Sequence, residues 1–160
     1  MARAGVGGVS SRIEQATVAL VDLLTAVGTF TVTQNEDVPV NFVTETTPVV
    51  NIEDGDDATE PHFIASNTVE FITQLTVSGY VTTNDAAALG QARDALWLAV
   101  WNVVLANPRL VNGSDELTWN VLPGSTTRRL ASEPGKPVAV FEVPVLLHIK
   151  AQADDPAVAA

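Results

Sequence analysis

An alternating run in the middle of the chain places the strongest limit on its fold. Between Asn67 and Tyr80, side chains that suit a protein interior occupy every second position. A period of two is typical of a β-strand with one buried face. One face would carry Val69, Phe71, Thr73, Leu75 and Val77, and the other would carry Glu70, Ile72, Gln74 and Thr76. The run therefore predicts a strand whose first face belongs to the hydrophobic core.

Two helices are predicted, one before and one after this strand. The first runs from Ser11 to Val27, opens with a capping box at Ser11 and carries one apolar stripe. The second runs from about Asp85 to Asn107. Residues Thr82 to Asp85 are suited to cap its first turn, and Pro108 stops it.

Shorter segments predict the remaining strands, at Thr29–Thr33, Pro48–Glu53, Leu117–Leu122 and Val138–Lys150. Glu60–Ser66 has no clear period and Pro123–Pro137 is long and polar, so both are expected to be loops. Pro144 lies inside the last strand and cannot donate a ladder hydrogen bond. An edge position or a bulge is therefore expected there.

The order of these elements predicts the fold class. Two helices beside one sheet make an α+β, two-layer domain whose sheet is antiparallel or mixed. We expect the domain to span residues 10–150, with tails at residues 1–9 and 151–160.

The charge balance excludes some functions. With 19 acidic and 8 basic residues the net charge is −11, which argues against ordinary nucleic-acid binding and against docking on anionic membranes. Only 17% of residues are charged, so the surface is relatively easy to desolvate and favours protein–protein contact. No apolar run approaches the roughly 20 residues of a membrane span, so we expect no membrane partner.

The second predicted helix is apolar on more than one side. Leu89, Leu96, Val100 and Val103 form one stripe, while Leu98, Trp101 and Leu105 lie roughly opposite, with Trp97 between them. Either the first helix covers this second side, or a neighbouring subunit does. On the second interpretation the subunit interface comprises Trp97, Leu98, Trp101 and Leu105, with the basic pair Arg128 and Arg129 as partners for carboxylates of another copy.

A search for chemistry finds no catalytic constellation, so we expect neither an enzyme nor a cofactor or metal. The chain has no cysteine and only the histidines His62 and His148. His148 is expected to be a packed or surface strand residue. His62 follows an acidic stretch containing Asp56, Asp57 and Glu60, but the spacing matches no known metal site.

The arrangement resembles a known family. A capped helix (Ser11 to Val27) leads into Thr29-Phe30-Thr31-Val32 and Pro48-Val49-Val50-Asn51-Ile52. The strand Glu70 to Val77 precedes a helix rich in Ala and aromatic residues, and the chain closes on Val140 to Leu147. Over residues 11–150 this is similar to the tail terminator, or tail completion, proteins of long-tailed bacteriophages.

The resemblance implies a structural virion protein without catalysis or cofactor. It would form a homo-oligomeric ring, a hexamer, at the head-proximal end of the tail tube, end tube growth and offer the head–tail joining surface. Its partners would be the tail tube protein and the head–tail connector or neck proteins, in the virion tail and neck after assembly in the host cytoplasm. DNA would pass through without specific binding.

An acidic lining would repel passing DNA. Glu53, Asp54, Asp56 and Asp57 are candidates for the lumen or rim of such a ring. The alternatives are another neck or head-completion subunit, or a tail-tube subunit with a stacking arm at Gln34 to Pro48. A different class is a small metal-binding or hydrolase domain that uses His62 and the acidic loop.

Overall fold

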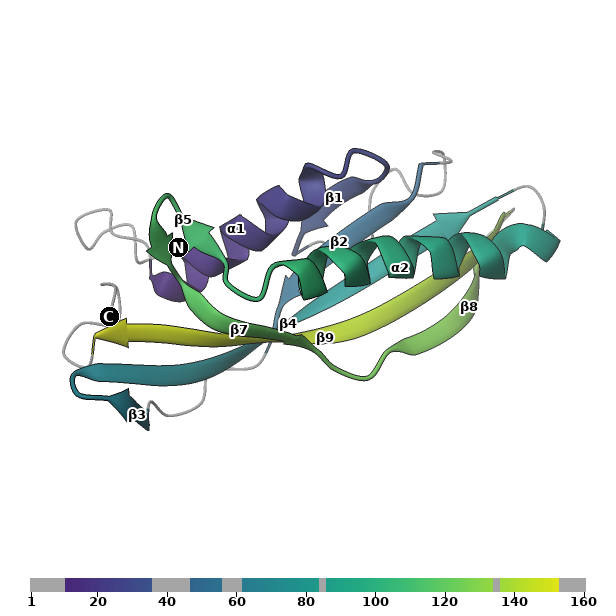
Figure 1. The fold of residues 1–160 in the computed structure, drawn as a ribbon. Coiled ribbons are helices and arrows are strands. Elements are labelled where there is room, and N and C mark those ends of the chain that lie inside the picture. Colours follow the sequence, from purple (N-terminus) through teal and green to yellow (C-terminus); the bar gives the residue numbers. More distant parts are fainter. Residues whose placement is uncertain (1–10, 36–46, 56–61, 84–85, 134–135, 153–160) are drawn as a thin grey trace.

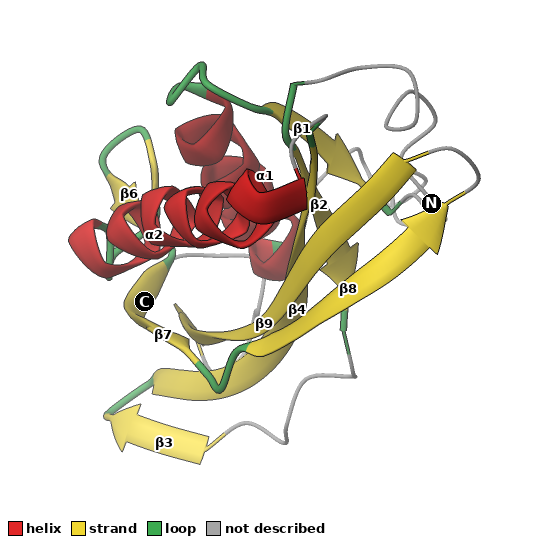
Figure 2. Ribbon diagram, turned by 90° about the vertical axis from the view of Figure 1, so that its right-hand side faces the viewer, coloured by secondary structure: helices red, strands yellow, loops and turns green. Residues whose placement is uncertain are grey.

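The computed structural model describes residues 11–35, 47–55, 62–83, 86–133 and 136–152 (Figure 1). Two helices pack on one face of a seven-stranded mixed sheet, and a small separate hairpin lies beside them (Figure 2). The predicted two-layer α+β fold is thus confirmed. The elements are α1 (Arg12–Thr25), β1 (Thr31–Gln34), β2 (Val49–Asp54), β3 (His62–Ala65), β4 (Thr68–Thr82), the 3-10 helix η2 (Ala86–Ala88), α2 (Leu89–Ala106), β5 (Val111–Asn112), β6 (Asp115–Glu116), β7 (Thr118–Pro123), β8 (Thr127–Glu133) and β9 (Lys136–Gln152).

Strands β4 and β9 form the spine of the sheet. They pair antiparallel along their whole length, from Thr68 opposite Gln152 to Thr82 opposite Val138. The main path of the sheet runs β1-β2-β4-β9-β7, while β3 pairs with β4 and β8 pairs with β9. Among the described strands of this sheet, β1 and β2 alone pair in parallel.

The predicted alternation of β4 is confirmed by its burial. Val69, Phe71, Leu75 and Val77 lie in the core cluster beneath the helices. The alternate positions face the other side of the sheet, where Tyr80 packs with a small second cluster formed by Val49, Val138 and Val140.

The first helix begins as predicted. The backbone N–H of Glu14 donates to Ser11 Oγ at 3.1 Å, and Gly28 follows the helix with a φ of 80°. That left-handed conformation favours glycine. Leu20 and Leu24 are fully buried against the sheet.

Arg12 fastens this helix to two other parts of the fold. Its side chain is buried, and Nε donates to the carbonyl of Lys150 in β9 at 2.7 Å. Nη1 donates to Asp115 Oδ2 at 2.7 Å, and Nη2 donates to the carbonyl of Glu116 at 2.7 Å. The hairpin β5–β6 is thereby held against α1 and β9.

Two predicted loops contain strands instead. Glu60–Ser66 contains β3, and Pro123–Pro137 contains β8. Both pair with only one neighbour among the described strands. Such strands keep polar or mixed side chains, and so the period of two is lost.

The start of the second helix also differs from prediction. Its N-cap is Ala88, which makes no side-chain capping hydrogen bond, and η2 provides the entry turn. Of the predicted capping residues, Asn84 and Asp85 lie outside the described part of the chain.

Pro144 lies in the central strand β9, contrary to the predicted edge or bulge. The N–H of Gly124 donates to the Pro144 carbonyl at 2.7 Å, so the polar backbone groups of Pro144 point toward the β7–β8 side. Pairing with β8 ends at Glu142 and pairing with β7 begins at Val145. The missing donor therefore falls between the two partner strands, where no ladder hydrogen bond is required.

Candidate subunit interface

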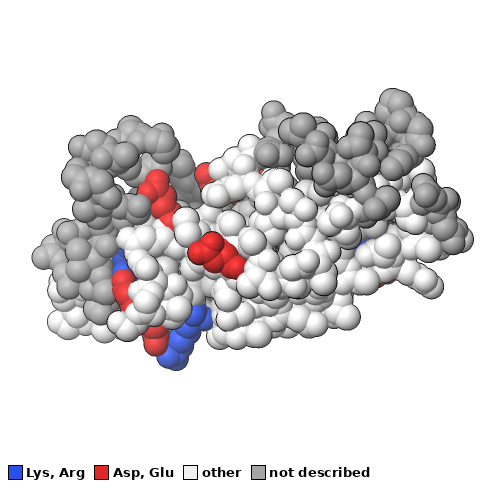
Figure 3. Space-filling model, turned by 90° about the horizontal axis from the view of Figure 1, so that it is seen from above, with Lys and Arg blue, Asp and Glu red and all other residues white. Residues whose placement is uncertain are grey.

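The outward face of α2 carries a stripe of uncharged side chains, with the exposed Asp94 beside it. Ala95, Leu98, Asn102 and Leu105 are exposed and recur every three or four residues. Leu98 is 50% exposed and Leu105 is 53% exposed. Figure 3 shows that charged atoms on the described part of this side gather over the α1 end and that the α2 end is almost free of them. An apolar helix face of this kind is cheap to desolvate and typical of a contact surface.

The two tryptophans of α2 are half-buried within the chain. Trp97 and Trp101 pack against the core, with ring centroids 4.9 Å apart. Trp97 Nε1 donates to Thr126 Oγ1 at 2.9 Å, and the guanidinium of Arg128 lies 5.4 Å from its ring centroid. The connection from β7 to β8 therefore covers Trp97, whereas Leu98 and Leu105 stay open.

The basic pair lies on β8, at the edge of the described sheet. Arg128 Nε lies 3.8 Å from Asp94 Oδ1, and Arg129 Nη2 donates to Glu142 Oε1 at 2.9 Å. Both side chains are about half exposed. Surface pairs of this kind contribute about 0–1 kcal/mol, so either arginine can exchange its partner at little cost.

The predicted lumen residues are described only in part. Glu53 and Asp54 end β2, where Asp54 accepts from Asn35 Nδ2 at 3.3 Å and Glu53 accepts from Asn51 Nδ2 at 3.1 Å. Asp56 and Asp57 lie outside the described residues. Their place in a lumen or rim stays a prediction.

The pKa of Tyr80 reflects the charges on this side of the sheet. Burial raises the pKa of its hydroxyl, and the carboxylates of Glu53 and Glu142 raise it further. Arg129 and a hydrogen bond with Ser78 lower it, but by less. Glu53 and Glu142 therefore face the same surroundings as Tyr80.

The structure contains a buried polar cluster that the sequence does not predict. Glu70 is buried, Trp119 Nε1 donates to its Oε2, and His148 Nδ1 lies 3.4 Å from its Oε1. The ring centroids of Trp119 and His148 lie 5.9 Å apart, edge to face. A bulge in β7 at Trp119 brings these groups together, and nothing in the local sequence signals it. The cluster joins β4, β7 and β9.

The alternative metal site is outside what the structure shows. Asp56, Asp57, Glu60 and the side chain of His62 are not among the described atoms. Within the described residues, no group of three or more His, Asp or Glu side chains is placed to hold a metal. No helix in that part of the chain is long and apolar enough to cross a bilayer.

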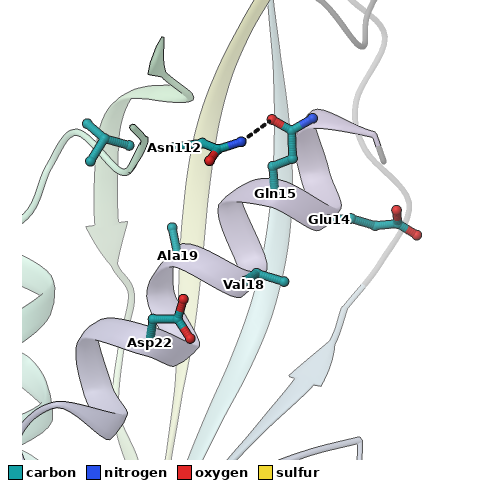
Figure 4. A pocket seen from close by; sticks show the side chains of 7 residues that line it. Glu14, Gln15, Val18, Ala19, Asp22 and Asn112 are labelled. Atoms are coloured by element: carbon teal, nitrogen blue, oxygen red, sulfur yellow. Dashed lines mark hydrogen bonds between the residues drawn. The ribbon is translucent and has the colours of Figure 1, made fainter. Parts of the chain in front are cut away.

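A groove opens between α1 and the hairpin β5–β6 (Figure 4). It has a volume of about 220 Å³, and Asn112 Nδ2 donates to Gln15 Oε1 across one end at 3.4 Å. Its apolar lining comes from Val18, Ala19 and Val111, and its acidic lining comes from Glu14 and Asp22. No local sequence pattern predicts this groove, because its two walls are about a hundred residues apart in the chain.

Comparisons with known proteins give a weak structural likeness. No protein-family model matches the chain, and no curated protein matches it significantly. Among solved structures, the chain is similar to the sheath/tube terminator of an extracellular contractile injection system, PVC, in its extended state. The TM-score is 0.30 at 12% sequence identity, and the match covers 89% of this chain and 58% of that chain. This chain thus spans less than two thirds of the length of the protein it resembles.

Proposed function

We propose that this chain is a structural subunit that closes into a ring with its own copies and ends a phage-type tail tube. The observation that carries the proposal is the outward stripe of α2. Arg93 and Asp94 are the only charged residues of this 18-residue helix, and Leu98 and Leu105 stand half exposed on it. Covering each leucine with a neighbouring copy would contribute about 1 kcal/mol by the area rule.

The sequence supports the same role in a second way. The order and character of its elements over residues 11–150 resemble those of tail terminator proteins. Its net charge of −11 suits a passage that DNA traverses without being gripped. The finer elements of the proposal follow: a hexameric ring, contact with the tube protein and with neck proteins, and a place in the virion tail.

The test is a pair of substitutions on the stripe. In the variant Leu98→Glu/Leu105→Glu, we expect the thermal midpoint to change little, because both side chains are half in water already. We expect self-association to weaken strongly, since each new carboxylate would be desolvated in the contact. Sedimentation velocity and negative-stain images measure both the mass and the shape of the particles.

The control is Leu122→Glu, because Leu122 is 42% exposed on β7, away from the stripe. If the double variant still forms rings, the stripe is not part of the interface. Open filaments instead of rings from the unmodified chain would favour a tube subunit over a terminator, because a heterologous contact that does not close grows without limit.

A further inference from the structure

Two surfaces at opposite ends of the molecule match in charge and in apolar character. One is the groove beside α1, at the left of Figure 1, and the other is the edge strand β8, at the right. We propose that β8 of one copy docks into the α1 groove of the next copy, so that the chain assembles head to tail. The partner is another copy, as the proposed function requires.

The groove offers two carboxylates with apolar surface between them. Glu14 and Asp22 are both lining residues, and Val18, 53% exposed, lies between them on the same helix. Val111 on the opposite wall is 49% exposed. A partner for this groove therefore needs positive charge beside an apolar contact.

Strand β8 presents that combination in three consecutive residues. Arg128 and Arg129 carry exposed guanidinium groups, and Leu130 is 70% exposed. On its outer side β8 pairs with no other described strand. Such an apolar side chain on an open strand edge is a typical site of association.

The two groove carboxylates are spread along the helix. Glu14 and Asp22 are eight residues apart, which corresponds to about 12 Å along its axis. Neighbouring residues of a strand point to opposite faces, so Leu130 shares its face with Arg128. With Leu130 against Val18 and Val111, Arg128 would lie beside one of the two carboxylates.

The contact joins two different surfaces, and so it is heterologous. A heterologous contact leaves one groove and one β8 strand unused on every pair of copies. Further copies add until the rotation between them closes the ring. A two-fold symmetric dimer would differ, because it would bury the same patch on both partners.

The experiment uses two variants of the full chain that damage one surface each. In Arg128→Ser/Arg129→Ser the groove is intact, and in Asp22→Arg the strand is intact. We expect each variant alone to remain monomeric at a concentration at which the unmodified chain assembles. Mixed in equal amounts, the two variants should form a heterodimer and nothing larger, because only one intact groove and one intact strand can meet. Native mass spectrometry resolves these species.

Asp54→Arg is the matched control, since it makes the same charge change on an exposed residue at the end of β2 and should assemble normally. Because Arg128 covers Trp97, Leu130→Ser replaces the double variant if that variant fails to fold. If the unmodified chain assembles and both variants assemble equally well, the head-to-tail contact is wrong while the proposed function stands. An unmodified chain that never assembles would instead overturn the proposed function itself.

Discussion

Gly79 lies opposite Phe141 across the β4–β9 pair, and its lack of a side chain makes room for the aromatic ring. A Cβ atom at this position would overlap the ring. Phe141 is fully buried in the main core, so the ring has no free direction in which to move. Glycine is required here by packing and not by backbone conformation.

Gly79→Ala should therefore destabilise the fold by about 1–3 kcal/mol, the usual range for overpacking. Urea unfolding measures the change. Phe141→Leu in the same chain should recover part of the loss, because the smaller side chain gives back the space. Strictly additive effects of the two substitutions would show that the two positions do not share this space.

Tyr80 is the only tyrosine, so its titration can be followed directly in the folded protein. Its pKa in the fold is raised, first by burial and then by Glu53 and Glu142. A raised pKa means that the folded state holds the proton more tightly than the unfolded state. This contribution to stability is complete below the unfolded pKa of about 10 and is lost as the pH rises through the folded value.

We expect Tyr80→Phe to reduce the loss of stability in the alkaline range, as measured by denaturation at several pH values. Glu53→Gln should move the tyrosinate absorbance transition to lower pH, because one repelling carboxylate is removed. A transition that stays in place would mean that Glu53 does not face Tyr80.

At the scale of elements, the attachment of α1 depends on Arg12. Its guanidinium makes hydrogen bonds to Lys150, Asp115 and Glu116, and its side chain is 0% exposed. Arg12→Met should cost on the order of 3 kcal/mol, since two carbonyls and one carboxylate lose the buried guanidinium as their partner. Thermal denaturation measures the loss. Arg109→Met is the control, because Arg109 is exposed and pairs with Glu116 at 3.5 Å, and it should change stability by less than about 1 kcal/mol.

The same scale shows why some elements could be predicted from the sequence and others could not. Both helices and β4 carry a local period that depends on their own residues alone. Strand β8 forms by pairing with β9. Its Arg128-Arg129-Leu130 stretch does not alternate between polar and apolar residues, so no local period predicts a strand there. The prediction of an edge or bulge at Pro144 was wrong for a related reason. Pro144 lies opposite the gap between β7 and β8, and this gap exists only once the sheet has assembled.

The exposed side of α2 was predictable to a similar extent, while its role as an interface stays a prediction. Helical projection placed Leu98, Trp101 and Leu105 on one side, and the structure leaves both leucines exposed. Trp101 differs because its large ring reaches the neighbouring Trp97 and the core, which a projection of Cα directions does not show. The groove beside α1 depends on the distant hairpin β5–β6, so no local signal could reveal it.

At the scale of the whole molecule, three surfaces differ in charge. They are the outward face of α2, the groove beside α1 and the edge strand β8. The stripe of α2 is uncharged, the α1 groove is acidic and β8 is basic. In the proposed contact, this division would let a chain of net charge −11 associate with itself, because Arg128 and Arg129 would meet an acidic groove.

The most direct test of self-assembly is the mass of the unmodified chain in solution at micromolar concentration. Sedimentation velocity, with negative-stain images of the same sample, should give one closed, ring-shaped species, a hexamer if the resemblance to tail terminators holds. A stable monomer that forms no ring even when tail tubes are supplied would contradict the proposed function.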